Sequence, residues 1–548
     1  MSDLPVPGTV RLIDAGGDLS VKHGSDKADI VLIPQPSSDP DDPLNWSWRR
    51  KAHNRVWQIL WTFIGVAITC ALAPAYPMIE ADTGIPAANI TTGVGLMYLF
   101  LGWGNVIVQP WAMHFGRRQV LLASLLATSL TVLWSAYVKS SGEWYANRIM
   151  MGISNSPVET LVEILVTDLS FTHERGVHMS AYTWTLFNGA FLAPIASGYI
   201  AENLGWQWIQ WIGTIIGVVT TISMFFSFEE TMFYRKTGPV EFLQAQGGSK
   251  DIEEPQEPTG GEKSLGESRK ISPPATENDI ATGETTSSIS RSQRYLRTLR
   301  LWGFRTPDQP GFSLKLSLLP FGLLRYPVIW FSGIWVGSVL SWFNVLNATT
   351  AENFGGEPYN FTTNQTGLTY LANVIGSTIG CFLAGSLSDI VAEALARRNQ
   401  GIKEPEHRLW LALIPLVLHP AGFFLYGIGA AQKLHWVALV FGVGLISATL
   451  PMGSLIALNY VIDCYKEAAS EAIVAVILIR NTMGFVITYA ISPMISDMGL
   501  QNAFILVGCL GAAIWGTCLL VIWFGKSWRT QSARSYWNIV EEHNLQAH

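Results

Sequence analysis

Two carboxylates lie within an apolar stretch of this chain, and their spacing puts them on one side of a helix. Between residues 145 and 167, the polar or small residues that recur every three or four positions are Arg148, Gly152, Asn155, Glu159 and Glu163. An ionised carboxylate near the middle of a membrane costs about 3 kcal/mol, so it should face a water-filled cavity or a partner. Glu159 is therefore predicted to bind a proton or a cationic solute, with Glu163 and Asn155 as further candidates. The alternative is a structural ion pair or a side chain that reaches the membrane surface.

Further candidate binding residues lie in apolar stretches of the C-terminal half. Arg480, followed by Asn481, lies within residues 471–494, where a guanidinium needs a carboxylate, carbonyl groups or an anionic ligand. A structural clamp is the alternative. Trp335 and Trp342 are candidates for an aromatic wall that contacts an amphipathic or cationic solute. Membrane tryptophans more often anchor a helix or pack against its neighbours.

These residues must be positioned by membrane helices, because the composition does not suit a soluble protein. Only 14% of the 548 residues are charged, 49% are hydrophobic and the mean hydropathy is +0.27, whereas soluble proteins carry roughly 25% charged residues. The net charge of −6 excludes a strongly basic nucleic-acid binder. Five cysteines without zinc-type spacing predict neither a disulfide scaffold nor a metal site, and no cofactor is expected.

Apolar stretches of about 20 residues, the length that crosses a membrane as a helix, occur twelve times. A polar segment rich in Gly, Pro, Ser, Thr and Glu divides them into two sets of six, and it is predicted to be a largely disordered linker. The predicted fold is an all-α membrane protein of 12 transmembrane helices in two six-helix halves. The expected spans are 56–79, 92–112, 119–138, 145–167, 178–201, 206–227, 323–346, 367–390, 409–430, 434–456, 471–494 and 501–524. The expected segments are a cytosolic tail (1–55), an N-terminal half (56–227), the linker (228–322), a C-terminal half (323–524) and a cytosolic tail (525–548).

The distribution of Lys and Arg predicts which loops face the cytosol. With the N-terminus inside, short external connections hold only Lys139 and Lys433, whereas short cytosolic ones hold Arg117, Arg118, Arg175, Arg397, Arg398, Lys403, Arg408 and Lys466. Eight against two fits the positive-inside rule. The connection between spans seven and eight would then be external, with glycosylation acceptors at Asn347, Asn360 and Asn364.

One motif imitates a nucleotide site. Gly525, Lys526 and Ser527 match the end of a phosphate-binding loop, but Leu520 stands where the first glycine is required. We therefore expect no ATP site and no enzyme activity. Energy for any movement of solutes would come from an ion gradient.

Two short loop motifs occupy the same place in the two halves. The chain reads His-Phe-Gly-Arg-Arg at 114–118, after span two, and Gly-Ser-Leu-Ser-Asp at 385–389, after span eight. A glycine permits a tight turn there, while arginine and aspartate can form charged contacts between the halves that break when a central site changes sides. The alternative is that the arginines only anchor the loops. The candidate gating residues are Gly116, Arg117, Arg118, Gly385, Asp389, Arg397 and Arg398.

These loops resemble the paired motif of the major facilitator superfamily of membrane transporters. The first copy departs from the family pattern at Met113, where an aspartate usually stands three residues before the glycine. The chain also resembles the fungal drug:proton antiporter-like group, which includes yeast polyamine and histidinol transporters. The segments that carry this likeness are DPDDPLNW at 39–46, FEETMFY at 228–234, EPEHRL at 404–409 and NYVIDCY at 459–465.

The resemblance implies roles for two further groups of residues. Arg148, with Gly152 four positions later, matches the family's span-four motif, for which a role in proton coupling is commonly inferred. Gly189, Pro194 and Gly198 resemble the bend associated with antiporters, although Ala193 stands where a glycine commonly precedes the proline. Pro removes a backbone hydrogen bond and Gly lets a neighbouring helix approach, so a bent helix is expected here.

The residues and the resemblance together predict a monomeric, proton-coupled secondary transporter in the fungal plasma membrane, with the vacuolar membrane as the alternative location. Its expected partners are a small organic solute, protons and the lipid bilayer. Efflux of a metabolite or toxic compound is the leading hypothesis. The alternatives are proton-coupled uptake of an organic cation such as a polyamine, and a membrane sensor that does not transport.

Overall fold

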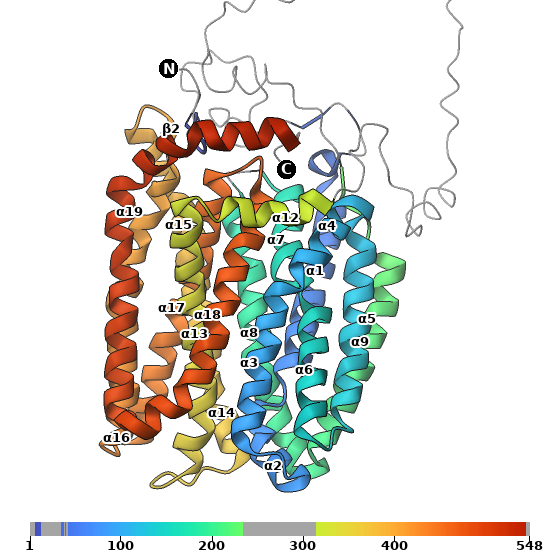
Figure 1. Ribbon diagram of the computed structural model, residues 1–548, viewed down its shortest axis with the longest axis vertical. Helices are drawn as coiled ribbons and strands as arrows, with labels where there is room; N and C mark the ends of the chain where they lie inside the picture. Colours follow the sequence, from blue (N-terminus) through green and yellow to red (C-terminus); the bar gives the residue numbers. More distant parts are fainter. Residues whose placement is uncertain are drawn as a thin grey trace, which may run out of the picture.

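The computed structural model describes residues 6–11, 34, 36–37, 39, 42–171, 174–233 and 314–543. Most of the predicted disordered linker, residues 234–313, therefore lies outside the described residues. The described chain is almost entirely helical and forms one bundle whose long axis is vertical in Figure 1. The N-terminal half is drawn in blue to green and the C-terminal half in yellow to red, and the two halves lie side by side.

Each half consists of long helices and shorter connecting ones. The N-terminal half contains α1 (Trp48–Cys70), α2 (Tyr76–Thr83), α3 (Ala87–Trp103), α4 (Asn105–Phe115), α5 (Arg117–Ser135), α6 (Ser141–Asn155), α7 (Pro157–Leu169), α8 (Arg175–Leu204) and α9 (Trp206–Ser227). The C-terminal half contains α13 (Pro327–Gly355), α14 (Thr363–Ala384), α15 (Ser386–Arg398), α16 (Leu413–Ala431), α17 (Trp436–Cys464), α18 (Ala469–Met498) and α19 (Leu500–His543). Between the halves, α12 (Leu314–Leu323) crosses the upper end of the bundle in Figure 1.

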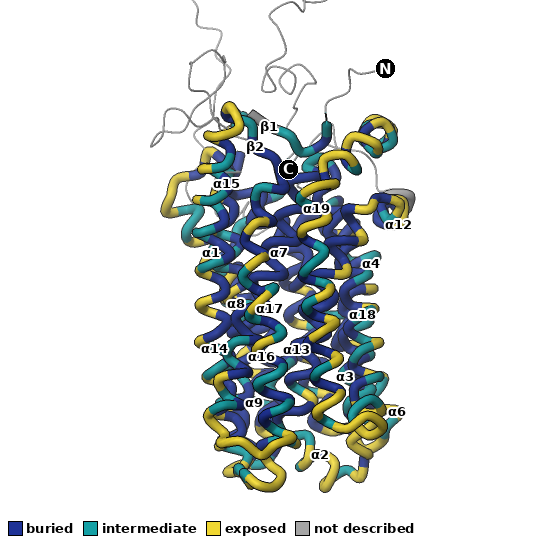
Figure 2. The backbone as a smooth tube through the Cα atoms, turned by 90° about the vertical axis from the view of Figure 1, so that its left-hand side faces the viewer, coloured by how far each residue is buried: buried dark blue, intermediate teal, exposed yellow. Residues whose placement is uncertain are grey.

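The smaller elements lie at the ends of the long helices. They are the 3₁₀ helices η1 (Pro43–Asn45), η2 (Ala73–Ala75) and η3 (Pro405–Ala412), and the strands β1 (Val10–Arg11) and β2 (Ile402–Lys403), which pair antiparallel. Figure 2 places β1, β2 and the end of α19 at the upper end of the bundle. We call this the terminal end, and the opposite end, which carries α2, the distal end.

Eleven segments of the described chain are long and apolar enough to cross a membrane, and they coincide with eleven of the twelve predicted spans. The remaining predicted span, 178–201, lies within α8, which is 30 residues long but is not among the eleven. Polar side chains that α8 buries, including Thr183, Thr185 and Asn188, reduce its apolar character. The protein is thus an all-helical, multi-pass membrane protein.

Two predicted elements differ from the structure. Predicted span four is two helices, because α6 ends at Asn155 and α7 begins at Pro157, where proline cannot donate the backbone hydrogen bond of a continuous helix. The expected single stripe of polar residues is therefore divided between two helices. The last helix is longer than expected, because α19 continues to His543 and includes most of the predicted tail.

The halves meet along two seams, one between α3 and α18 and the other between α8 and α14. Close approach at each seam depends on glycine. A Cβ added at Gly102 of α3 would lie 2.6 Å from the Cβ of Asn481, and one at Gly198 of α8 would lie 3.2 Å from the carbonyl oxygen of Thr363. Small residues therefore bring the helices of opposite halves close enough for direct polar contacts.

Candidate functional site

A buried ion pair joins the two halves near the middle of the bundle. One carboxylate oxygen of Glu159, on α7, lies 2.7 Å from Nη1 of Arg480, on α18. The other accepts a hydrogen bond of 3.0 Å from the side-chain amide of Asn481. Glu159 is 4% exposed, so this contact is shielded from water by the surrounding helices. The sequence predicted all three residues as candidates, and the structure brings them together.

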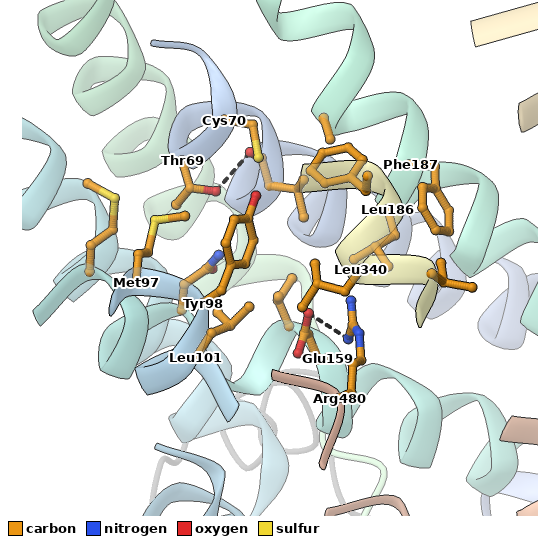
Figure 3. A pocket seen from close by; sticks show the side chains of 17 residues that line it. Thr69, Cys70, Met97, Tyr98, Leu101, Glu159, Leu186, Phe187, Leu340 and Arg480 are labelled. Carbon is orange, nitrogen blue, oxygen red and sulfur yellow. Dashed lines mark hydrogen bonds and ion pairs between the residues drawn. The ribbon is translucent and has the colours of Figure 1, made fainter. Parts of the chain in front are cut away.

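A cavity of about 60 Å³ lies beside this pair. Figure 3 shows the side chains that line it, with Glu159 and Arg480 directed toward each other. Both halves contribute to the lining, and most of the lining side chains are apolar. The polar ones are Thr69, Cys70, Tyr98, Asn155, Glu159 and Arg480. A cavity of this size holds only a few water molecules, since each needs about 10–15 Å³. It is too small for an organic solute, so the structure represents a closed form of the site.

Glu163 lies one helical turn beyond Glu159 on α7 and is also buried. Its Oε2 atom has no hydrogen-bond partner among the described residues. The charges of Arg480 and Glu159 both act on this carboxyl group. A buried polar atom without a hydrogen bond is costly, so Glu163 is less well satisfied than Glu159 in this conformation.

Arg148 is separated from these carboxylates by the break between α6 and α7. Its guanidinium stacks on Trp144 at 3.8 Å from the ring centroid, and Nη2 donates to the hydroxyl of Ser135 on α5. Nη1 lies 3.3 Å from the sulfur of Met151. Within the described part of the chain, no carboxylate forms a salt bridge with Arg148. The residue is buried in the N-terminal half rather than at the contact between halves.

The predicted aromatic wall is not formed by Trp335 and Trp342. The indole nitrogen of Trp335 donates to the carbonyl of Ile514 and to Thr517, and the ring stacks on Trp515 of α19. The ring of Trp342 packs against His419 and Phe423 of α16. Neither tryptophan lines the cavity. Both side chains point into the C-terminal half, where they pack against other aromatic rings.

The contacts of the first loop motif with other described residues of its half include those of Gly116, Arg117 and Arg118, whereas contacts between the halves were expected. Gly116 has φ of 117° and connects α4 to α5. Glu230 accepts hydrogen bonds from the backbone N–H groups of Arg117 and Arg118, which begin α5. The guanidinium of Arg117 lies 3.0 Å from the carboxylate of Asp168 on α7. Nη2 of Arg118 donates to the carbonyl of Phe225, and both partners belong to the same half.

The second motif does contact the opposite half. Gly385 lies so close to α8 that a Cβ there would be 2.4 Å from the Cβ of Ser180. The carboxylate of Asp389 lies against Gly176, in the first turn of α8, where the partial positive charge of a helix N-terminus favours an anion. Asp389 also forms a salt bridge of 2.9 Å with Arg408. This motif therefore helps to close the terminal end of the bundle.

The remaining predicted site residues do not take part in these contacts at the terminal end. Arg397 pairs with Glu393 on the same helix and is exposed, as is Arg398. On α8, Gly189 faces the backbone of Phe63 in α1, Gly198 faces α14, and Pro194 lies inside the helix. The predicted glycosylation acceptors lie toward the distal end of the bundle: Asn360 is exposed between α13 and α14, whereas Asn347 and Asn364 are partly buried within those helices.

Sequence reasoning missed two buried charge clusters at the terminal end. In the first, Asp463 binds Lys403 at 3.0 Å and Arg408 at 3.2 Å. Burial lowers the pKa of Lys403 to about 8, although the Asp463 carboxylate opposes this effect. In the second, Arg529 of α19 binds both Glu404 and Glu406. A search of the whole sequence for ionisable residues near the ends of the spans could have found Asp463. It could not have paired Asp463 with Lys403 and Arg408, because these partners are distant in sequence.

A helical membrane protein whose two halves meet at a buried charged pair beside a central cavity has the architecture of a secondary transporter. Comparison with known proteins agrees: residues 59–461 match the Major Facilitator Superfamily. The chain belongs to this family.

Similar proteins support the assignment along the whole chain. An uncharacterised MFS-type transporter of Schizosaccharomyces pombe is 31% identical, over 98% of this chain and 95% of the relative. Protein HOL1 of Saccharomyces cerevisiae is 27% identical, over 97% and 96%. Among solved structures, the human organic anion transporter MFSD10 has the same fold, with a TM-score of 0.52 and 14% identity over 85% of this chain and 99% of that one.

Proposed function

We propose that this protein is a proton-coupled efflux transporter of a small amphipathic organic compound in the plasma membrane, and that it works by alternating access. The observation that carries the proposal is the ion pair between Glu159 of one half and Arg480 of the other, beside a closed cavity. Any opening that separates α7 from α18 must break this pair. Removal of one partner of a buried pair costs about 3–5 kcal/mol, because the other charge is left without compensation.

Protonation provides a way to release the pair. A neutral Glu159 no longer attracts Arg480 as an ion, so a proton that reaches this carboxylate weakens the contact between the halves. The solute would then bind in the cavity with Arg480 and Asn481 available to it. Release of the proton on the opposite side of the membrane would restore the ion pair. One movement of the halves would then be coupled to one proton.

The lining of the cavity favours an amphipathic compound as the solute. Eleven of its 17 lining residues are apolar, and Glu159 is the one carboxylate among them. A polyamine carries several positive charges and would require more acidic groups than this lining offers. Uptake of an organic cation remains the second candidate, because Glu163 supplies a second buried carboxyl group one turn away.

The proposed orientation, with twelve spans and both termini in the cytosol, is supported by the position of basic residues. The loops that contain Arg117, Arg175, Lys403 and Lys466 are on the terminal side of the bundle, which fits a cytosolic face under the positive-inside rule. In this arrangement α8 also crosses the membrane, which brings the number of spans to twelve. Asn360 would then face the outside.

Transport by the purified chain in proteoliposomes with an imposed pH gradient tests the proposal. The probes are amphipathic compounds with a single charge, with spermidine as the comparison and a pH-sensitive dye to report proton flux. We expect gradient-driven movement of at least one amphipathic probe with accompanying proton flux. Glu159→Gln should abolish gradient-driven transport but retain exchange of solute without a gradient. Full gradient-driven transport with unchanged pH dependence in Glu159→Gln would overturn the coupling role, and transport of spermidine alone would support the second candidate.

A further inference from the structure

A groove of about 970 Å³ lies on the outside of the N-terminal half, separate from the central cavity. It is bounded by α4, α5 and α9, and the junction between α6 and α7 contributes to it. Several of its side chains are strongly exposed, among them Ile107 (71%) and Ile222 (55%). An apolar and exposed surface on a multi-pass membrane protein faces the hydrocarbon of the bilayer.

The groove has the volume of a ligand site rather than of a packing defect. Pockets for small organic ligands measure about 300–1,000 Å³, and their walls are mostly apolar and aromatic with a few polar groups. Here the aromatic side chains are Trp111, Phe225 and Phe226, and the wall between them is built from aliphatic residues of α5 and α9. The lining along α5 extends from residue 119 to residue 127, which corresponds to about 12 Å at 1.5 Å per residue. A rigid apolar molecule fits such a wall with less loss of conformational entropy than a flexible chain.

One polar side chain in this groove lacks a partner. Gln119, in the first turn of α5, is 9% exposed, and its side-chain nitrogen has no hydrogen-bond partner among the described residues. Two other polar groups of the lining are satisfied inside the protein: Ser124 donates to the carbonyl of Ser154, and Thr221 to that of Gly217. A buried amide without a partner costs about 1–3 kcal/mol. The last side-chain torsion of Gln is soft, so either amide atom can turn toward a ligand.

The charges near Gln119 argue against a phosphate headgroup. The neighbouring cation, Arg118, donates to the carbonyl of Phe225, and its guanidinium lies 5.4 Å from the centroid of that ring. Its backbone N–H is bound by Glu230, whose negative charge would repel a phosphate. A neutral hydroxyl, in contrast, can donate to the amide oxygen of Gln119 or accept from its nitrogen.

We propose that this groove binds a sterol, a rigid ring-built lipid with a single hydroxyl group. The hydroxyl hydrogen-bonds the amide of Gln119 at the terminal end of the groove, and the rings pack against Trp111, Ile222 and Phe226. The wall of the groove includes Pro157, two residues before Glu159. The ligand therefore supports the break between α6 and α7 from the membrane side, while Glu159 contacts the C-terminal half from the other side.

Photolabelling of the full chain in lipid nanodiscs tests this proposal without relying on transport. The probes are a photoreactive sterol and a photoreactive phosphatidylcholine, each with its unlabelled counterpart as competitor. We expect saturable labelling of peptides from α5 and α9 by the sterol probe, displaced by unlabelled sterol and not by phosphatidylcholine. Because exposed Ala123 lines the groove, Ala123→Trp fills it and should reduce sterol labelling at least roughly fivefold.

Two further variants complete the experiment. Gln119→Leu removes the hydrogen bond but keeps the apolar wall, so affinity for the sterol should fall about 2- to 12-fold, as expected for one hydrogen bond. Ile375→Trp, at a 62% exposed position on α14, introduces the same side chain outside the groove and should leave labelling unchanged. Labelling that does not saturate, that is as strong in Ala123→Trp and Gln119→Leu as in the parent protein, or that phosphatidylcholine displaces as well as sterol does would overturn the proposal.

Discussion

At the scale of single residues, the two buried carboxyl groups of α7 differ in their surroundings although they are one turn apart. Both oxygens of Glu159 have partners from α18. Glu163 is equally buried, but its Oε2 atom has no partner in the described part of the chain. The two carboxyl groups therefore differ in how far their oxygens are satisfied by neighbouring side chains.

This difference predicts effects of different size on stability. Glu163→Gln replaces a carboxyl group that, among the described residues, has no salt bridge and whose Oε2 atom has no hydrogen bond to lose by an amide of similar shape, so the free energy of unfolding should change by less than about 1 kcal/mol. Glu159→Gln leaves Arg480 without its counter-ion and should cost about 3–5 kcal/mol. Denaturation of the detergent-solubilised proteins would measure both changes. Equal losses in the two variants would show that Glu163 is also ionised in this state.

The sequence identified the residues of this site but not their arrangement. The need of Arg480 for a carboxylate follows from its depth in an apolar stretch, whereas Glu159 and Asn481 lie 322 positions apart and their contact depends on how the halves pack. The polar stripe from Arg148 to Glu163 is divided between α6 and α7 because the first helix ends before Pro157. The sequence contains this signal, since a proline marks a probable helix boundary. The directions of Trp335 and Trp342 follow from packing inside one half, which the sequence does not specify.

At the scale of elements, the extension of α19 at the end of the chain contacts the first described segment, which contains β1. Arg529, which is fully buried, donates to the carbonyl of Pro7 and binds both Glu404 and Glu406. The hydroxyl of Thr9 also donates to Glu404. Burial raises the pKa of Glu404, but its hydrogen bonds from Lys526 and Arg529 outweigh this and hold the pKa below its usual range. The segment that contains β1 is therefore held on the C-terminal half.

Two cations that bind the same carboxylate should contribute unequally. Arg529→Met removes the buried cation that Glu404 and Glu406 share and should lower the free energy of unfolding by about 3–5 kcal/mol. Lys526→Met removes a cation that is 61% exposed, so its loss should cost about 0–1 kcal/mol because water screens the pair. Thermal unfolding of both variants in the same detergent would measure the contrast. A cost for Lys526→Met as large as that for Arg529→Met would contradict this account.

The stability contributed by Glu404 should also depend on pH. Since its pKa is lower in the folded protein than in the unfolded chain, the folded state gains stability above the ordinary glutamate pKa and loses it as the pH falls below that value. Unfolding measured from pH 7 to pH 3 should therefore show a smaller acid-induced loss in Glu404→Gln than in the parent protein. The same acid-induced loss in both proteins would exclude Glu404 as a source of it.

At the scale of the whole molecule, the proposed alternating access requires the contacts at the terminal end to break. The amide of Gln109, on α4, donates to the carbonyl of Ser470 in α18, and Asp389 lies against the first turn of α8. These contacts join opposite halves, so an opening toward the terminal end separates them. Lateral hydrogen bonds, Trp103 to Thr482 and Trp184 to Thr378, join the halves along the two seams.

Cross-linking should distinguish contacts that move from contacts that do not. In a background where the five native cysteines are replaced, Gln109→Cys with Ser470→Cys should allow a short bifunctional reagent to connect the halves at the terminal end. Transport should then stop, because that end can no longer open, and a reducible reagent should permit recovery. Asn89→Cys with Ser141→Cys is the matched control, since Asn89 donates to Ser141 within the N-terminal half, which we expect to move as one body. Undiminished transport after complete cross-linking of the first pair would mean that the halves do not separate there, and loss of transport in the control would mean that the N-terminal half itself deforms.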